Sequence, residues 1–265
     1  MIAFEHAWHA TRGAREYQED SAIVGSAGAN GSEGAGGGLV AVLADGMGGH
    51  TGGAMASRVC CEQFLNVFNS LTGPVPQRLR EALHAANGAV AQAVMANPIL
   101  SGMGSTLIGV SFSDAGVEWI SVGDSPLWLF RRGEIALLNE DHSLAPELDR
   151  LARIGRITAQ EARTDPRRHM LRSAVTGEDL DLVDQSQKPL VLADGDYVIL
   201  ASDGLHALEE GELARIIAAY ADDGPDAVAR ALIRAVEAVR DPHQDNATVV
   251  VVRALPRPCP EPVHP

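Results

Sequence analysis

The chain has 265 residues, of which 46% are hydrophobic and 21% are charged, values that are typical of a globular protein and exclude global disorder. The 35 acidic and 21 basic residues give a net charge of −14, which argues against a protein that binds the phosphate backbone of nucleic acids. No apolar run approaches the roughly 20 residues of a membrane-spanning helix, so we expect no membrane partner. The N-terminus has no basic region followed by an apolar stretch, which predicts no signal peptide and a cytoplasmic protein.

Eight segments have the length and the apolar or alternating pattern of strands. They are residues 2–8, 21–25, 39–44, 105–112, 117–122, 127–130, 197–201 and 248–252. Turn signals at 114–116 and 131–134 predict antiparallel hairpins. The Gly-, Ala- and Ser-rich stretch 25–38 lies between two strands and predicts a flexible hairpin tip.

Four longer segments have apolar residues at helical spacing: 54–71, 76–95, 210–220 and 225–239. Pro76 and Pro225 are suited to the first turn of their helices. Two helices, a block of strands, two further helices and a closing strand favour two sheets packed face to face with helix pairs outside. We therefore predict an α+β fold, a four-layer αββα sandwich of two antiparallel sheets, formed by one domain over residues 1–253.

Two segments fall outside this pattern. Residues 143–171 combine the starts of two short helices, at 143–146 and 156–158, with a polar loop at 164–168, and we expect a mobile flap over the ends of the sheets. Residues 254–265 are rich in proline and are expected to form a disordered tail.

Four aspartates occupy the ends of predicted strands, although aspartate is a poor strand residue. Asp45, Asp124 and Asp203 each follow a strand closely, and Asp245 comes shortly before the last one. If the four strand ends converge, their carboxylates repel one another and need neutralisation, most naturally by hard divalent cations with oxygen ligands. A single Asp-Gly is as often a plain turn, and Asp114 is interpreted in that way.

Signatures of other reaction classes are absent from the sequence. It contains no Gly-x-x-x-x-Gly-Lys-Ser/Thr loop for nucleotide phosphates, no His-Glu-x-x-His zinc helix and no Gly-x-Ser-x-Gly nucleophile elbow. The three cysteines form no Cys-x-x-Cys pair of the kind that binds zinc.

Six motifs then occur in a specific order over residues 5–253. They are Arg-Glu-Tyr-Gln-Glu-Asp at 15–20, Asp-Gly-Met-Gly-Gly-His at 45–50, Gly-Met-Gly-Ser-Thr at 102–106, Gly-Asp-Ser at 123–125, Ser-Asp-Gly at 202–204 and Asp-Asn-Ala-Thr-Val at 245–249. In this series the chain resembles the metal-dependent protein phosphatases, the protein phosphatase 2C (PPM) family, in its bacterial form.

The resemblance implies a cofactor of two Mn²⁺ or Mg²⁺ ions at one end of the sandwich. Asp45 would bridge the two ions, the carbonyl of Gly46 would bind one of them, and Asp203 and Asp245 would complete the other. In addition, Glu19 and Asp20 match positions that hold metal-bound waters.

Further roles are implied by the same resemblance. Asp124 matches a ligand of a third, weaker metal of bacterial members, to which the flap near Thr164 would contribute. Asn246 would lie just behind the ligands and support them.

The resemblance also implies how the substrate is handled. Arg15 would grip the phosphate oxygens, and His50 would protonate the departing Ser or Thr oxygen. This chain has one residue fewer than the family between Gly13 and the arginine, so Arg12 is an alternative to Arg15. For His50 the alternative is a structural histidine in a Gly-rich turn.

The function implied by the family is a Mn²⁺/Mg²⁺-dependent protein serine/threonine phosphatase, which hydrolyses phosphoserine and phosphothreonine by attack of a metal-bridging water. The alternative is an inactive pseudophosphatase that acts as a phosphoprotein-binding module. Expected partners are phosphorylated proteins that are targets of a bacterial Ser/Thr kinase, with no nucleic acid and no membrane, and the chain is expected to be a monomer.

Overall fold

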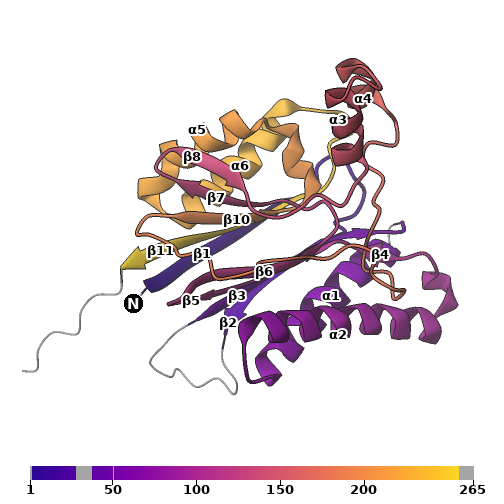
Figure 1. Cartoon of the computed structure of the whole chain (residues 1–265), viewed down its shortest axis with the longest axis horizontal. Helices are drawn as coiled ribbons and strands as arrows, with labels where there is room; N and C mark the ends of the chain where they lie inside the picture. The colour runs from indigo at the N-terminus through magenta and orange to yellow at the C-terminus, as the bar shows by residue number, and fades with distance from the viewer. Residues whose placement is uncertain (1, 28–37, 50, 257–265) are drawn as a thin grey trace, which may run out of the picture.

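The structure, a computed structural model, describes residues 2–27, 38–49 and 51–256. Two antiparallel β-sheets pack face to face, and a helix pair covers the outer face of each sheet, as Figure 1 shows. This confirms the four-layer αββα sandwich. Most of the predicted hairpin tip at 25–38, His50 and residues 257–265 of the predicted tail lie outside the described residues. Over the described ranges, no helix has the length and apolar character needed to cross a bilayer.

The first sheet contains both ends of the described chain. In spatial order it consists of β1 (Ile2–Thr11), β11 (Ala247–Pro256), β10 (Tyr197–Ala201), β7 (Leu127–Arg131) and β8 (Glu134–Leu137). The central strands β10 and β11 are buried along nearly their whole length, which explains their continuous apolar runs.

The second sheet contains the predicted hairpin with the turn at 114–116, whereas the predicted hairpin with the turn at 131–134, formed by β7 and β8, belongs to the first sheet. The order of the second sheet is β2 (Asp20–Ser26), β3 (Leu39–Met47), β5 (Leu107–Ser113), β6 (Gly116–Val122) and β9 (Asp184–Gln185), and β4 (Gly104–Ser105) pairs with the end of β3. Strands β5 and β6 are joined by the turn at 114–116, as predicted.

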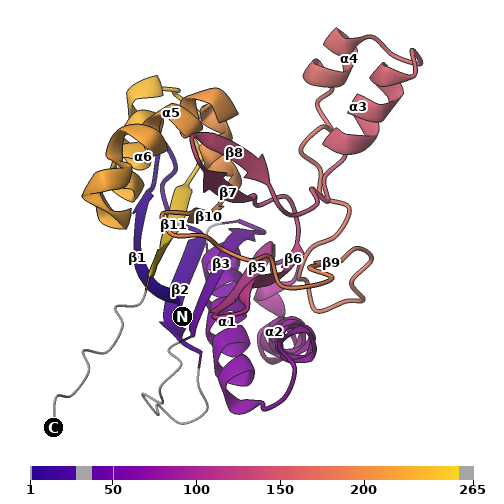
Figure 2. The ribbon, with the colours of Figure 1, turned by 60° about the vertical axis from the view of Figure 1, so that its left-hand side comes forward.

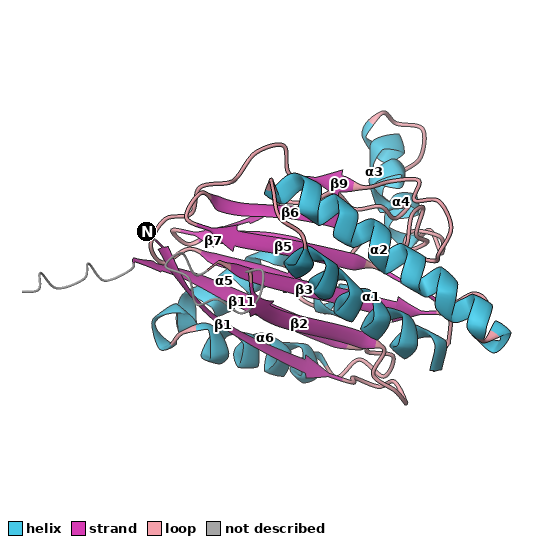
Figure 3. Cartoon of the chain, turned by 90° about the horizontal axis from the view of Figure 1, so that it is seen from below, coloured by secondary structure: helices cyan, strands magenta, loops and turns pink. Residues whose placement is uncertain are grey.

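The helix pairs bury an apolar face on each sheet. Helices α1 (Thr51–Ser70) and α2 (Val75–Ala96) cover the second sheet, as seen from below in Figure 3, while α5 (Glu210–Tyr220) and α6 (Pro225–Val239) cover the first. Short 3₁₀ helices occur at Pro98–Leu100, Asp203–Ala207 and Ala221–Asp223. A third apolar core fills the space between the sheets. Three stacked cores hold the strand ends in fixed positions, and the site is built from those ends.

Helices α3 (Ala145–Arg153) and α4 (Ala159–Thr164) stand away from the sandwich, as Figures 1 and 2 show. Thr158 caps α4 through a capping box. Its side chain accepts a hydrogen bond from the backbone N–H of Glu161, and the Glu161 carboxylate accepts one from the backbone N–H of Thr158. The two short helices of the predicted flap are therefore present, and its mobility stays a prediction.

Strand β11 is longer than the strand 248–252 that the sequence pattern predicted. This strand continues to Pro256, three residues beyond the predicted boundary at 253, because its last residues pair with the start of β1. Ala254 accepts a hydrogen bond from Gly195 and donates one to the carbonyl of Asp196, each 2.9 Å long. Strands β8 and β9 were not predicted, since the first is largely exposed and the second has only two residues.

Candidate metal centre

Five carboxylates, here called the carboxylate cluster, come together at one end of the sandwich. They are Asp20, Asp45, Asp124, Asp203 and Asp245, supplied by the ends of β2, β3, β6, β10 and β11. Within the second sheet, Asp20 lies directly opposite Asp45 in register. All members except Asp20 line an open cleft of about 690 Å³. The structure thus brings together the four strand-end aspartates that the sequence pattern singled out.

Burial and mutual repulsion dominate the electrostatics of the cluster. Asp45 is half-buried as a residue, but its carboxyl group is surrounded by protein, and this burial together with the charges of Asp20 and Asp203 raises its pKa well above the usual range. Burial raises the pKa of Asp20 to about 6, although a hydrogen bond from Ser202 opposes the shift. Two adjacent carboxyl groups with raised pKa values are typical of a functional site, and a bound cation would relieve their repulsion.

The remaining members show the same effect. Burial, followed by the charges of Asp203 and Asp141, raises the pKa of Asp124 to about 7. Burial and the charge of Asp245 raise the pKa of Asp203. Each of these groups would be stabilised in its charged form by a nearby positive ion.

One buried oxygen of the cluster has no partner within the described ranges. Asp20 is 8% exposed, and its Oδ2 accepts a 2.8 Å hydrogen bond from Ser202 Oγ, whereas its Oδ1 finds no hydrogen-bond partner there. A buried carboxylate oxygen of this kind fits a metal-bound water better than a closed structural role.

The residues fit hard divalent cations in kind, but they do not yet enclose one. Within the described ranges, no group of three or more His, Cys, Asp or Glu side chains could hold a metal ion as it stands. Within the cluster, Asp245 is engaged by a cationic side chain, because its Oδ2 accepts a 2.5 Å hydrogen bond from Arg15. The all-oxygen donor set, the burial and the repulsion nevertheless match the chemistry of Mn²⁺ or Mg²⁺.

The backbone around Gly46 is too tightly packed for any other residue. A Cβ at this position would lie 2.1 Å from the carbonyl oxygen of Gly53 and 2.5 Å from that of Glu19. The Gly46 amide donates to the Glu19 carbonyl at 3.2 Å. The Asp-Gly pair is therefore more than a turn signal, because the missing side chain lets three segments meet beside the cleft.

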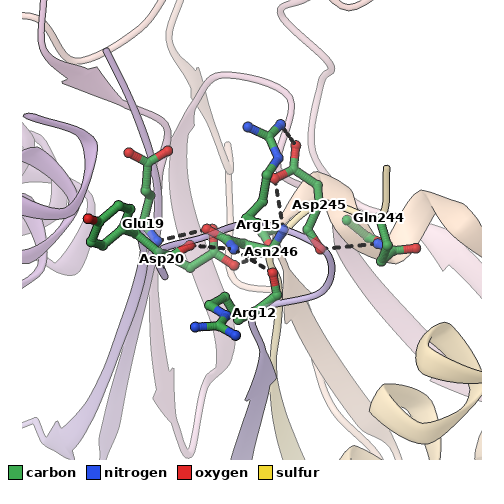
Figure 4. A network of polar contacts seen from close by, with 10 residues as sticks. Arg12, Arg15, Glu19, Asp20, Gln244, Asp245 and Asn246 are labelled. Atoms are coloured by element: carbon green, nitrogen blue, oxygen red, sulfur yellow. Dashed lines mark hydrogen bonds and ion pairs between the residues drawn. The ribbon is translucent and has the colours of Figure 1, made fainter. Parts of the chain in front are cut away.

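Asn246 ties the loop between β1 and β2 to the start of β11. Its Oδ1 accepts from the Glu19 amide at 2.7 Å, and its Nδ2 donates to the carbonyls of Arg12 and Tyr17, both at 2.9 Å, as seen in Figure 4. With 4% exposure, this amide is a buried clamp behind the carboxylates. The supporting role that the resemblance implies for Asn246 stays a prediction.

Arg15 and Arg12 lie in different surroundings. Arg15 lines the cleft beside Asp245, with its side chain 54% exposed, whereas the guanidinium of Arg12 donates to the Glu16 carbonyl and does not line the cleft (Figure 4). Gly13, with φ of +59°, packs so closely on the Asp245 backbone that a Cβ would lie 2.3 Å from its carbonyl oxygen. This contact fixes the shortened segment, and of the two arginines Arg15 is the one that lines the cleft.

The predicted flap residue Thr164 does not line the cleft. Thr164 ends α4 and its hydroxyl donates to the Gln160 carbonyl at 2.9 Å. His50 lies outside the described residues.

Several residues that sequence reasoning missed do line the cleft. His169 and Arg172 follow α4, and Glu178, Asp179 and Asp181 come from the next loop. His169 belongs to the predicted flap, whereas residues 172–181 were assigned no element, because no periodicity indicated which way this segment turns. Asp-Pro at 165–166 and Thr-Gly at 176–177 were the available signals for its turns.

Comparison with known proteins gives one consistent result. A family model described as protein phosphatase 2C matches residues 28–246. The serine/threonine protein phosphatase PstP of Mycobacterium tuberculosis is 33% identical over 211 residues, which make up 79% of this chain and 39% of that protein, so the chain spans well under half of that relative. The serine/threonine phosphatase stp of Listeria monocytogenes is 30% identical over 184 residues, 67% of this chain and 71% of that protein.

A solved structure extends the similarity over nearly the whole fold. The catalytic domain of a serine/threonine protein phosphatase PstP, in complex with two manganese ions, superposes with a TM-score of 0.76 at 28% identity. The match covers 97% of this chain and 100% of that one.

Proposed function

The chain belongs to the protein phosphatase 2C family, and on that premise we propose that it is a Mn²⁺/Mg²⁺-dependent protein serine/threonine phosphatase. The observation that supports this most directly is the carboxylate cluster, in which buried acids with raised pKa values share one open cleft. A cluster of this kind is destabilised unless cations neutralise it.

We propose the cation ligands that the family resemblance implies, and all of the residues concerned except Asp20 line the cleft. Asp45, the Gly46 carbonyl, Asp203 and Asp245 would hold a pair of ions, and Asp124 would serve a third. Glu19 and Asp20 would hold the waters around them. Two ions held in this way would supply charge neutralisation and an activated bridging water for in-line attack at phosphorus.

The chain's own side chains bind and orient the substrate. A guanidinium has five N–H donors, so Arg15 can keep its contact with Asp245 and still present donors to phosphate oxygens from the cleft edge. Asn246 holds the loop that carries Arg15 in register with β11. His50 would donate a proton to the departing alkoxide, since its ordinary pKa lies near neutrality.

The alternative, an inactive pseudophosphatase, is not favoured. Its mark in the sequence would be the loss of an acidic residue from the centre, and Asp45, Asp203 and Asp245 are all present. The substrates we propose are phosphoserine and phosphothreonine proteins, which require a Ser/Thr kinase as the supplying enzyme.

Metal dependence gives the decisive test. Hydrolysis of a small aryl phosphate should require Mn²⁺ or Mg²⁺, stop in EDTA and return when excess Mn²⁺ is added. In parallel, Mn²⁺ should raise the melting temperature of the EDTA-treated protein, because ions relieve the repulsion in the folded state alone. Full turnover in metal-free buffer would contradict the proposal, as would Mn²⁺ that changes neither turnover nor melting temperature.

A further inference from the structure

One wall of the cleft is formed by residues 176–182, here called the acidic loop, which descends from the α3–α4 pair toward β9 in Figure 2. Three of its carboxylates, on Glu178, Asp179 and Asp181, line the cleft. All three residues are exposed, and within the described ranges none of the three side chains makes an ion pair or a hydrogen bond. They have no part in the proposed ion ligation, so their charge is available to a ligand.

The backbone of the acidic loop is fixed by side chains from elsewhere. Asn87 on α2 accepts from the Gly177 amide at 2.8 Å and donates to the Glu178 carbonyl at 2.7 Å. At the other end, Ser173 Oγ donates to the Leu182 carbonyl at 2.9 Å and accepts from its amide at 3.0 Å. Four hydrogen bonds thus hold the loop, and a ligand that contacts its carboxylates would not have to order it first.

The charges of the cleft are unevenly distributed. Metal ions would neutralise the carboxylate cluster, whereas no described arginine, lysine or histidine forms an ion pair with the carboxylates of the acidic loop. Arg15 and Arg172 are the only cleft-lining arginine or lysine residues among those described. At about 690 Å³ the cleft has room for more than a phosphate group, so residues beside a phosphorylated side chain would pass along this wall. Acidic neighbours would be repelled there and basic neighbours attracted.

We propose that the acidic loop determines substrate specificity, with Glu178, Asp179 and Asp181 selecting phosphoproteins that carry lysine or arginine beside the phosphorylated residue. The inference rests on the proposed function and adds the substrate class. It also explains how a chain of net charge −14 can attract an anionic group, because the positive flanks of the substrate contribute to the encounter.

Matched phosphothreonine peptides test this selection. Peptides of equal length with arginine or glutamate on both sides of the phosphothreonine are compared by kcat/KM in Mn²⁺. The arginine peptide should be preferred by about tenfold at low salt, and the preference should shrink at about 0.5 M salt, where screening acts within a few ångströms.

Three variants separate the acidic loop from general charge effects. The triple variant Glu178→Gln, Asp179→Asn, Asp181→Asn should reduce the preference to less than about twofold. The charge-conserving Glu178→Asp, Asp179→Glu, Asp181→Glu should retain it. A control set with the same loss of charge is formed by exposed residues that do not line the cleft, and it should also retain the preference; it consists of Glu62→Gln, Asp222→Asn and Asp223→Asn.

A wild-type protein without the preference, or a neutralised loop that keeps it, would overturn the inference. Binding of the same peptides, followed by fluorescence anisotropy, gives a readout without turnover. A protein that binds the arginine peptide more tightly but hydrolyses neither peptide nor an aryl phosphate would refute the proposed function and support the role of the loop. Equal binding of both peptides would refute that role.

Discussion

The carboxylate cluster and the acidic loop both contribute carboxylates to the same cleft, yet the surroundings of these carboxylates differ. Members of the cluster extend from strand ends whose backbones are locked by the sandwich, and burial raises the pKa values of Asp45 and Asp124. The three acids of the loop are exposed to water. Burial therefore favours the binding of cations at the carboxylate cluster. The exposed carboxylates of the acidic loop attract positive charge at longer range, without affinity for a particular ion.

The largest effect on turnover should come from removing single charges of the carboxylate cluster. Asp203→Asn and Asp245→Asn should each reduce turnover by about 100-fold or more, because each replaces a charged ligand by a neutral one of the same shape. Circular dichroism should show an intact fold. Asp114→Asn is the matched control, since this exposed turn residue accepts from the Ile2 amide through Oδ1 and should change turnover little. Equal loss in all three variants would show that the cluster is misassigned.

His50 should have an effect that depends on the leaving group. His50→Ala should lower kcat by about 100-fold on a phosphoserine peptide, whose alkoxide needs a proton, and barely change it on an aryl phosphate. Parallel kcat measurements on the two substrates check this. Equal loss on both would indicate a defect in folding or ion binding, and no loss on either would return His50 to a structural role.

Arg15 should act mainly on binding. Arg15→Ala should raise KM by about tenfold with a smaller change in kcat, because the guanidinium would hold the phosphate in ground and transition states alike. Arg12→Ala is the control, and steady-state kinetics on an aryl phosphate compares the two. A KM effect that appears only in Arg12→Ala would mean that the other arginine grips the phosphate.

The smallest effect should be a stability difference that depends on pH. Since the folded pKa of Asp124 is raised from 3.8 to about 7, the metal-free protein bears a cost for its charge above pH 7 that is relieved as the pH falls. In EDTA, Asp124→Asn should therefore melt a few degrees higher than the wild type at pH 8, and the gap should shrink below pH 7 and close only at about pH 4, near the ordinary pKa of an aspartate. A gap that is constant with pH would show that Asp124 does not titrate in this range.

The regular elements could be predicted because each carries a local pattern. Helices α5 and α6 have the predicted bounds, and the apolar runs of β3, β10 and β11 are continuous because both faces of these strands are buried. The ends of these strands then indicated the aspartates. Strand β8, in contrast, has only four residues and is largely exposed, so it lacks a continuous apolar run, although the turn before it at 131–134 was predicted.

The acidic loop could not be predicted for a different reason. Its course depends on Asn87, whose contact with Gly177 spans 90 positions in sequence, and on Ser173. Neither residue belongs to a motif, and an exposed Glu-Asp pair is ordinary in an acidic chain. Only tertiary contacts determine that these side chains face the cleft.

The hydrogen bond from Ser202 to Asp20 has a mechanical consequence. Ser202 follows β10 in one sheet and Asp20 begins β2 in the other, so this 2.8 Å contact bridges the seam between the two halves of the sandwich. Asp45 and Asp203 face each other across the same seam. Because each sheet supplies part of the centre, its geometry depends on how the two sheets are aligned. Sliding one sheet over the other by about an ångström would separate the ligands while leaving each sheet intact.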